Sequence, residues 1–510
     1  MRYTVIINLS KNDGRPLYRQ IQEQLKNQIL SGRLPKGYRL PSERKFADLL
    51  NVNRTTIKNA LKNLDGEGLT TTKVGSGRVV AYPGSSGGAA DDNRRSAPWN
   101  ILINDHLKNS CDWALETIQK VNASKHDTIS FVSGAPFFES CSVDVFKGIL
   151  ETLLAEHAGE LLSYSPPGGM PELIEELLSW FNTKGVSAHH KELMIVDGCQ
   201  QGIYLATSVL VEPGDVVVFP QPGYLGAAQT FKAAGARLVG VDINEDGICL
   251  DSLKNILKHY CPKFIYTQPN FQNPSGISMS LENRLQLLEL SYRYGVPIVE
   301  DDPYEDLRYK GQRILSLKAL DEKNNVISVG SFSKILYPGL RVGWVVAPSS
   351  IIKHFKAVKR NINLHTNTFG QRVILEYFRK RLFNEHLEEV KKEYSLRART
   401  MIGALRESRL DNLTWFEPDG GYFIWLQMLD DIDAYHLLEE GCKSGVTFVP
   451  GKEFCLSGGR SCLRLSFAST PVELIVEGVG RLRSCVERIR GKRKNEGGIK
   501  REIFHEELIL

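Results

Sequence analysis

The stretch Ser331-Phe332-Ser333-Lys334, with Arg341 seven residues beyond the lysine, combines an amine, two hydroxyls and a guanidinium. It follows the apolar run at residues 326–329, which predicts a buried β-strand. An amine can condense with a carbonyl group, whereas hydroxyls and a guanidinium bind phosphate. A lysine in so short a motif is also common as a solvated surface charge. The rest of the sequence has to separate these two interpretations.

Length and composition indicate a globular protein with a large core. The chain has 510 residues, of which 42% are hydrophobic and 24% charged, which is typical of soluble proteins. A chain of this length predicts about three domains. We find no apolar stretch long enough to span a membrane, and the N-terminal residues lead us to expect no secretory signal. The nine cysteines contain no Cys-x-x-Cys pair, which favours reduced thiols in a cytoplasm over disulfides or zinc.

Charge is distributed unevenly along the chain. Residues 1–83 carry 15 lysines and arginines against 6 aspartates and glutamates, a net charge of +9. The remaining 427 residues carry 49 against 53, a net charge of −4. The basic segment favours a polyanionic partner, although a solvated basic surface is the other interpretation. A Gly/Ser/Ala-rich stretch separates the two parts, and we predict a linker at residues 83–97.

Residues 1–82, the head, show helical periodicity followed by strand-like sequence. Pro16 can begin a first helix with an apolar residue at every fourth position. Ser42 and Asn53 can cap a second and a third helix, and residues 69–80 predict two β segments around a Gly-Ser-Gly turn. The buried side predicted for the second helix comprises Phe46, Leu49 and Leu50. Two helices joined by a tight turn and followed by a hairpin form a winged helix-turn-helix.

The third helix carries polar and cationic residues at its N-terminal end, where a recognition helix meets base edges and phosphates. The residues that we predict to contact DNA are Arg44, Asn53, Arg54, Thr55, Thr56, Lys58 and Lys73. A helical bundle with a charged exterior is the alternative. Through Leu40-Pro41-Ser42-Glu43-Arg44, Asn53-Arg54-Thr55-Thr56-Ile57-Lys58 and the glycine-turned wing, the head resembles the GntR family of bacterial regulators. The resemblance implies that the matching positions lie at the DNA.

From about residue 98 onward, apolar runs alternate with amphipathic helices, which predicts an α/β fold with a mostly parallel sheet. Ligands bind such sheets at the carboxyl ends of the strands. The run at residues 193–196 leads into the turn Gly198-Cys199-Gln200, which can seat a phosphate on a helix N-terminus. The run at residues 264–267 leads towards Asn273, whose amide can bond a phenolic oxygen. Each turn is also compatible with an ordinary loop.

A third apolar run, at residues 296–299, leads into Asp301 and Tyr304. A carboxylate at a strand end can pair with a pyridinium N–H and so keep the ring an electron sink, and a phenol can donate to a ring oxygen. A solvated acidic loop is the alternative. Together with Lys334 these groups match what pyridoxal phosphate requires.

With these motifs in place, residues 98–490 resemble the fold-type I, class I/II aminotransferases, which carry a mostly parallel sheet and a small C-terminal α+β subdomain. The resemblance implies that Lys334 forms the internal aldimine and that Asp301 pairs with the ring nitrogen. Asn273 and Tyr304 would bond the phenolic oxygen. The phosphate residues that it implies are Gly198, Cys199, Gln200, Ser331, Ser333 and Arg341. Cys199 departs from the serine or alanine usual in that turn.

The same resemblance implies four further positions. Tyr224 would stack on the ring, and Tyr164 would reach the phosphate from the partner subunit of a homodimer. Arg464 would clamp the substrate carboxylate as a bidentate pair, with Gly134 near the substrate. A structural arginine is the other interpretation of Arg464. Residues 491–510, of mixed charge, receive no role.

A GntR-type head on an aminotransferase-like body is the architecture of the MocR group of regulators. It implies a cytoplasmic DNA-binding transcriptional regulator that senses pyridoxal phosphate, or an amino compound, through the Lys334 aldimine. The first alternative is an active aminotransferase carrying a DNA-binding domain, because nothing among its catalytic positions is disabled. A third possibility is a body that serves only as a dimerisation scaffold. The sequence leaves open whether the chain turns over a transamination.

Overall fold

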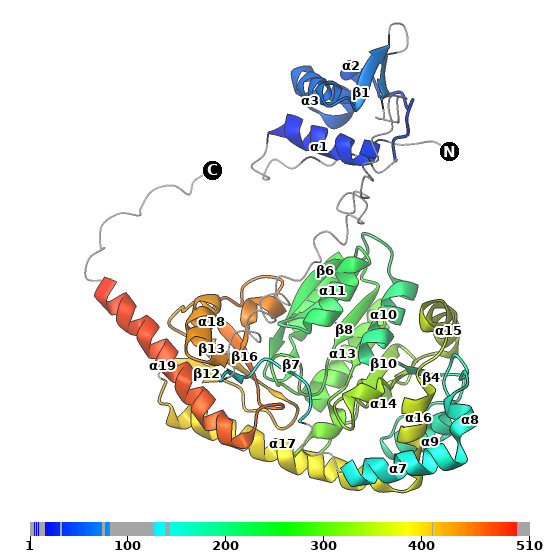
Figure 1. The fold of residues 1–510 in the computed structure, drawn as a ribbon, viewed down its shortest axis with the longest axis vertical. Helices are drawn as coiled ribbons and strands as arrows, with labels where there is room; N and C mark the ends of the chain where they lie inside the picture. The colour runs from blue at the N-terminus through cyan, green and yellow to red at the C-terminus, as the bar shows by residue number, and fades with distance from the viewer. Residues whose placement is uncertain are drawn as a thin grey trace, which may run out of the picture. The chain divides into compact units, whose positions relative to one another are not determined.

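A computed structural model of the chain describes residues 5, 7, 9, 16–30, 33–73, 77–81, 127–137, 143–410 and 412–496. The chain divides into two compact units, Met1–Asn109 and Ser110–Leu510, which are drawn in Figure 1. The predicted linker at residues 83–97 lies outside the described residues, so the predicted boundaries stay predictions. Gly75 and Ser76 of the predicted wing turn and residues 497–510 of the tail also lie outside the described residues.

The head has the predicted order of elements. Its elements are α1 (Leu17–Leu30), α2 (Glu43–Leu50), α3 (Arg54–Gly66), β1 (Thr70–Lys73) and β2 (Gly77–Val80), with the two strands paired antiparallel. Both predicted caps are confirmed: Ser42 Oγ accepts from the Lys45 amide at 3.3 Å, and Asn53 Oδ1 accepts from the Thr55 amide at 3.0 Å. Each bond satisfies a helix N–H that has no partner within its own helix.

One burial prediction in the head is wrong. Phe46 is buried and Leu50 half-buried, but Leu49 is 66% exposed. The buried partner of Phe46 is Ala47. Successive residues of an α-helix are about 100° apart, so the face shared by Phe46, Ala47 and Leu50 turns Leu49 towards solvent. The apolar side of this short helix is thus narrower than the sequence suggested.

The body is built on an eight-stranded sheet in the order β4-β11-β10-β9-β8-β5-β6-β7 (Figure 1). Its strands are β4 (Leu193–Val196), β5 (Val216–Gln221), β6 (Arg237–Asn244), β7 (Gly247–Ile248), β8 (Phe264–Thr267), β9 (Ile298–Asp301), β10 (Val326–Ser331) and β11 (Gly343–Val346). The pairs β10–β9, β9–β8, β8–β5 and β5–β6 are parallel, and those made by β11 and β7 are antiparallel. The predicted mostly parallel sheet is therefore confirmed.

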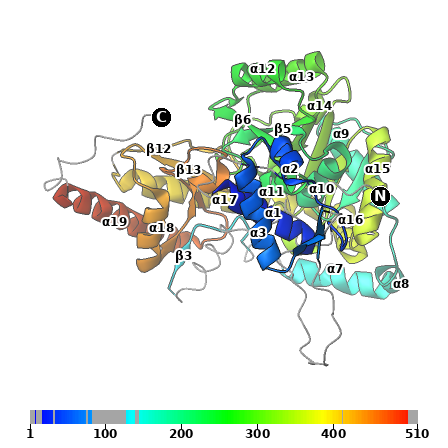
Figure 2. The same ribbon diagram turned by 90° about the horizontal axis from the view of Figure 1, so that it is seen from above.

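Helices cover both faces of this sheet. Along β5, Val217 and Phe219 pack into one apolar cluster while Val218 packs into another, because successive side chains of a strand point to opposite faces. One face carries α10 (Cys199–Leu210), α11 (Leu225–Ala233) and α15 (Ser349–Asn363); the other carries α12 (Leu250–His259) and α13 (Leu281–Tyr294). Figure 2 shows α12 and α13 side by side. Strands buried on both faces explain the unbroken apolar runs of the sequence.

A smaller antiparallel sheet, β12-β13-β16-β15, forms the C-terminal part of the body. Its strands are β12 (Leu413–Trp415), β13 (Phe423–Met428), β15 (Val449–Pro450) and β16 (Cys462–Ser466), and a separate parallel pair joins β3 (Ile129–Ser130) to β14 (Val446–Thr447). The long helices α17 (Leu382–Glu407) and α19 (Val472–Glu496) pack against each other (Figure 1). This arrangement matches the predicted α+β subdomain.

The remaining helices complete the body. They are α7 (Val143–Glu156), α8 (Ala158–Leu161), α9 (Pro171–Thr183), α14 (Leu317–Leu320), α16 (Thr368–Arg379), α18 (Ala434–Lys443) and the short turns Glu305–Leu307, Pro338–Leu340 and Gly451–Phe454. Among the residues that the structure describes, no helix combines the length and the apolarity that crossing a membrane requires.

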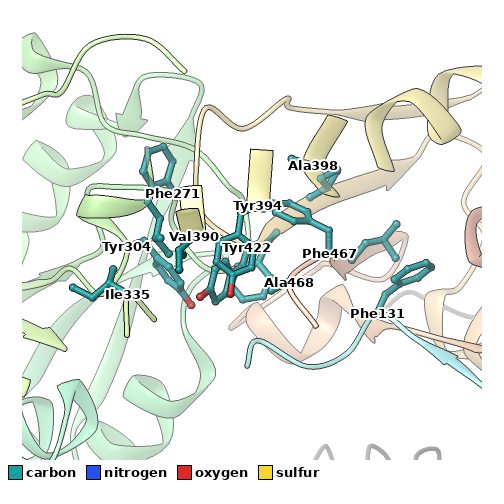
Figure 3. Close-up of a cluster of buried hydrophobic side chains, with 14 of the residues drawn as sticks. Phe131, Phe271, Tyr304, Ile335, Val390, Tyr394, Ala398, Tyr422, Phe467 and Ala468 are labelled. Atoms are coloured by element: carbon teal, nitrogen blue, oxygen red, sulfur yellow. The ribbon is translucent and has the colours of Figure 1, made fainter. Parts of the chain in front are cut away.

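An aromatic cluster lies where the large sheet and the C-terminal part meet (Figure 3). The ring centroids of Tyr394 and Tyr422 are 4.7 Å apart, and those of Tyr304 and Tyr422 are 5.4 Å apart. The Tyr422 hydroxyl donates to the backbone oxygen of Lys334 at 2.7 Å. The cluster therefore holds the backbone at Lys334 in place.

Candidate functional site

The predicted residues of the body converge on one cavity of about 320 Å³. The ends of β4, β9 and β10 supply much of its wall, as the rule for open α/β sheets predicts. It is lined by Gly134, Gly198, Cys199, Gln200, Tyr224, Gln268, Asn273, Asp301, Pro303, Tyr304, Ser331, Ser333, Lys334, Arg341, Phe423 and Arg464. Every predicted residue of the body except Tyr164 is present.

One end of the cavity has the features of a phosphate site. The Ser331 hydroxyl donates to Ser333 Oγ at 3.0 Å, and Arg341 Nη1 donates to the same oxygen at 3.1 Å. α10 begins at Cys199 with its free N–H groups at this end, which favours an anion. At Gly198 φ is +101°, a conformation that residues with a side chain rarely adopt, and a Cβ there would lie 3.0 Å from Arg341 Nη2.

Lys334 lies deep in the cavity. Its Nζ donates to the backbone oxygen of Gly134 at 2.8 Å. Burial lowers the pKa of Lys334 to about 8, and the nearby Arg464 and Arg341 act in the same direction. The uncharged amine is the nucleophile in a reaction with a carbonyl group. A lowered pKa therefore gives Lys334 a larger reactive fraction near neutral pH than an ordinary lysine has.

Asp301 offers a free acceptor in the same cavity. Its Oδ2 accepts from the Tyr266 hydroxyl at 2.6 Å and from Gln268 Nε2 at 2.7 Å, while its buried Oδ1 has no hydrogen-bond partner among the residues that the structure describes. Burial raises the pKa of Asp301, whereas these donors and Lys334 lower it. A buried unpaired acceptor is costly, so a ligand N–H at Oδ1 would be stabilising.

Arg464, on β16, is 7% exposed and ready for an anion. Its Nη1 donates to Asn273 Oδ1 at 2.9 Å and its Nη2 to the Val132 oxygen at 2.6 Å, while Nε has no partner in the described part of the chain. Its guanidinium carbon lies 4.3 Å from the ring centroid of Phe423. Burial lowers the pKa of Arg464 to about 10. A carboxylate would supply the countercharge that this side chain lacks among the described residues.

Two tyrosines complete the wall around these groups. The Tyr224 hydroxyl donates to Gln200 Oε1 at 3.1 Å. Tyr304 is 3% exposed. Burial raises the pKa of both phenols, which therefore stay protonated and able to donate.

Tyr164 is not brought to the cavity of its own chain. It is 83% exposed, and its ring lies edge-on to His365 at a centroid distance of 5.4 Å. Both side chains line a separate surface depression of about 750 Å³, with Leu161, Leu162 and Phe369. The predicted role of Tyr164 in a partner's site stays a prediction.

In the head, the predicted DNA-contacting residues lie on or beside the start of α3. Arg44, Asn53, Arg54, Thr55 and Lys58 are exposed and Thr56 is half-buried. Arg54 Nε lies 3.5 Å from Glu43 Oε2, a solvated ion pair of small strength. Lys73 ends β1, and its side chain is outside the described residues. Five of the predicted side chains thus lie in the cap and the first turns of α3, and Arg44 lies in the first turn of α2, next to Glu43.

Sequence reasoning missed four residues of the cavity and its surroundings. Gln268, Pro303 and Phe423 line the cavity, and Tyr266 bonds Asp301 from behind. A signal for Phe423 exists in the sequence, because Gly420-Gly421 precedes Tyr422-Phe423. A Cβ on Gly420 would lie 2.3 Å from the Phe271 ring, and close packing of this kind marks a functional glycine.

Comparison with known proteins agrees with this geometry. The family model "Aminotransferase class I and II" matches residues 127–482. The chain belongs to the aminotransferase class I and II family. The model "Bacterial regulatory proteins, gntR family" matches residues 17–80, so the head is a DNA-binding domain of that family. An aminotransferase-family body behind a gntR-family head is the MocR-type architecture that the sequence predicted.

Relatives of both kinds are known. The probable rhizopine catabolism regulatory protein MocR of Rhizobium meliloti is 28% identical, covering 94% of this chain and 95% of its own. Aromatic-amino-acid aminotransferase 1 of Thermococcus litoralis is 34% identical, covering 71% of this chain and 88% of its own. Kynurenine aminotransferase of Pyrococcus horikoshii, solved in complex with PMP, is 33% identical with a TM-score of 0.72, covering 78% of this chain and 98% of that one. The aminotransferase-family fold of the body is thus shared with enzymes and regulators alike.

Proposed function

We propose that this protein is a cytoplasmic transcriptional regulator whose body binds pyridoxal phosphate and reads an amino compound that enters the same cavity. The observation that carries the proposal is the combination of a gntR-family head with the cavity around Lys334. A metabolic enzyme needs no DNA-binding domain, and a scaffold needs no buried lysine with a lowered pKa. MocR-type relatives that align over nearly the whole chain support it.

The residues present fit this cofactor. Ser331, Ser333, Arg341 and the N-terminus of α10 would hold its phosphate. The unpartnered Oδ1 of Asp301 would accept a ring N–H. When bound, pyridoxal phosphate supplies an aldehyde that condenses with amines and a ring that withdraws electrons. The fit rests on an orphaned acceptor and on a glycine turn that a side chain would block.

The other residues of the cavity would bind and orient the amino compound. Arg464 would hold a carboxylate, since its Nε is free and its guanidinium is fixed between the Phe423 and Phe454 rings. Tyr304 would keep its proton and donate to a ring oxygen, beside Asn273. Lys334 would serve as the covalent anchor of the cofactor, and its free amine would accept or donate a proton in the cavity. Binding of an amino compound would thus alter the contacts of Lys334.

A switch requires two arrangements of the protein that the ligand distinguishes. We propose that these are two arrangements of a homodimer in which Tyr164 reaches the partner's cavity. The exposure of Tyr164 and its place beside a surface depression support this. Two heads would then read two half-sites of an operator.

The proposal is tested by adding pyridoxal phosphate to the purified protein and recording visible absorbance. The wild type should develop an absorbance that Lys334→Ala abolishes and that the exposed-lysine control Lys147→Ala retains. A wild type that stays without absorbance at saturating cofactor would falsify cofactor binding. An operator fragment whose affinity does not respond to any amino compound would contradict the sensing role.

Aminotransferase activity is the second candidate function. It is favoured by one observation: Lys334, Asp301, Asn273, Tyr304 and Arg464 all line the same cavity, as a transaminase requires. Repeated turnover with an amino donor and a keto acid would establish it. A single conversion that stops after one equivalent per chain would favour the sensor.

A further inference from the structure

Tyr266 is a buried phenol whose hydroxyl donates to the carboxylate of Asp301. It lies in β8 with none of its surface exposed, its ring stacked on Phe219 at a centroid distance of 5.7 Å and 7° between planes. Phe231 packs edge-on to the same ring at 5.4 Å. The hydroxyl donates to Asp301 Oδ2 at 2.6 Å. With its ring fixed by two aromatic neighbours, Tyr266 presents a rigid donor to that carboxylate.

Gln268, two residues further along the chain, reinforces the arrangement. Its Nε2 donates to Oδ2 of Asp301 at 2.7 Å, and its Oε1 accepts from the backbone N–H of Asn273 at 3.1 Å. One side chain therefore fixes both Asp301 and Asn273. The Cys199 thiol also lies against the Asp301 carboxyl, and burial together with Asp301 raises the pKa of this thiol well above its usual range. Cys199 thus stays protonated and adds no negative charge beside Asp301.

The neighbouring carboxyl, Asp302, shows what these donors achieve. Within the described ranges of the chain, Asp302 Oδ2 accepts from Asn270 Nδ2 alone, at 2.6 Å, and its Oδ1 has no partner. Burial raises the pKa of Asp302 well above its usual range, with Glu305 and Glu300 adding repulsion. Asp301 is also buried, but its Oδ2 accepts from two donors and the Lys334 amine lies nearby. Burial raises the pKa of both carboxyls, and these neighbours oppose the rise at Asp301.

We infer that Tyr266 and Gln268 are positioning residues, which hold Asp301 as a carboxylate and leave its Oδ1 for the ring nitrogen of the cofactor. This inference rests on the proposed cofactor binding. Both donors occupy the same oxygen, so the other oxygen is the one left for a ligand. A carboxylate there keeps the ring nitrogen protonated, and a neutral acid does not.

The titratable groups that face Asp301 come from several elements. They are Cys199 from the start of α10, Tyr224 from the start of α11, Tyr266 from β8, Tyr304 after β9 and Lys334 from the turn after β10. Of the groups around Asp301, the neutral side chains Tyr266 and Gln268 are the two that donate hydrogen bonds to its carboxylate.

The test is the variant Tyr266→Phe, which keeps the stacked ring and removes only the hydroxyl. A hydrogen bond to a charged group changes an equilibrium by about tenfold to a hundredfold. We expect the dissociation constant of pyridoxal phosphate to rise by about tenfold or more. We also expect the pKa of the ring nitrogen of the bound cofactor, measured from its absorbance as a function of pH, to fall by about one unit.

The matched control is Tyr292→Phe. Tyr292 lies on α13, and its hydroxyl also donates to a carboxylate, Oδ1 of Asp321, at 2.9 Å. This control should leave both readouts unchanged. Gln268→Leu should move both in the same direction as Tyr266→Phe, which covers the case in which one variant folds poorly. An affinity within twofold of wild type and an unshifted spectrum in both variants overturn the inference. A wild type that never binds the cofactor overturns the proposed function instead.

Discussion

The head and the body present their functional side chains in opposite ways. In the head, Arg54 is 70% exposed along its side chain and meets only a loose ion pair with Glu43. In the body, Asp301 and Arg464 are 1% and 7% exposed, and aromatic rings and hydrogen bonds fix them. DNA supplies its own dense negative charge, so a reader can keep its cations in water. A small ligand must be met by groups that are already in place.

This difference concerns stability as well as function. The core of the head is a single small cluster around Ile57, Leu61 and Leu64, whereas the body buries three larger clusters. Small cores give small stability margins. Because each unit has its own core, we expect a core substitution in one unit to lower the stability of that unit and to leave the stability of the other unchanged.

The largest effect should follow Phe383→Ala in the body. Phe383 is 2% exposed and stacks on Phe378 at a centroid distance of 4.7 Å, with Trp180 at 5.5 Å. Removing its ring should lower the free energy of unfolding by about 3–5 kcal/mol. Urea unfolding followed by tryptophan fluorescence measures this. Leu285→Ala, at a position 49% exposed, should change it by no more than about 0.5 kcal/mol.

A smaller loss should follow Leu61→Ala in the head. Leu61 is 1% exposed in α3, and its truncation should cost about 2–4 kcal/mol of the head's stability. DNA affinity should fall while cofactor absorbance at the body persists. Leu49→Ala, at the exposed position, serves as the control and should leave DNA affinity intact. Loss of cofactor binding in Leu61→Ala would contradict the independence of the two units.

The pH dependence of cofactor attachment should follow Lys334. Because its pKa is lowered to about 8, the fraction of uncharged amine rises as pH increases and levels off above that value. The initial rate of absorbance change should increase about tenfold per pH unit below pH 8 and little beyond it. Stopped-flow absorbance across this range measures it. A rate that keeps climbing to pH 10 would show an ordinary lysine.

The smallest effect should follow Arg54→Ala. Loss of one phosphate contact should weaken DNA binding at every sequence and reduce the slope of log affinity against log salt by about one. Lys26→Ala is a fitting control, because Lys26 lies on α1 and pairs with Glu67 at 2.8 Å, away from the start of α3. Cofactor affinity should respond to neither variant. Equal slopes for wild type and Arg54→Ala would remove Arg54 from the interface.

The sequence predicted most of the cavity because its residues stand directly after apolar runs. Asn273, Asp301 and Lys334 were recognised from short motifs at strand ends, where the topology of a parallel sheet brings distant segments together. The caps at Ser42 and Asn53 follow from equally local chemistry. Local patterns of this kind survive folding unchanged.

What the sequence did not show depends on contacts between distant residues. Tyr266 sits inside an apolar run, and nothing nearby in the sequence marks its hydroxyl for a carboxylate 35 residues away. Leu49 was misjudged because three apolar residues on a short helix do not fix which face is buried. The place of Tyr164 depends on a second chain, which no single-chain pattern defines.

The hydrogen bond from Lys334 Nζ to the Gly134 oxygen depends on the number of hydrogens that the lysine nitrogen carries. A free amine carries two or three hydrogens, and fewer remain on a nitrogen that has condensed with an aldehyde. Gly134 belongs to residues 127–137, the first described segment of the body after the chain leaves the head. Covalent attachment of the cofactor that we propose at Lys334 would therefore leave fewer donors for that segment. The same backbone continues, through residues outside the described part, to the domain that binds DNA.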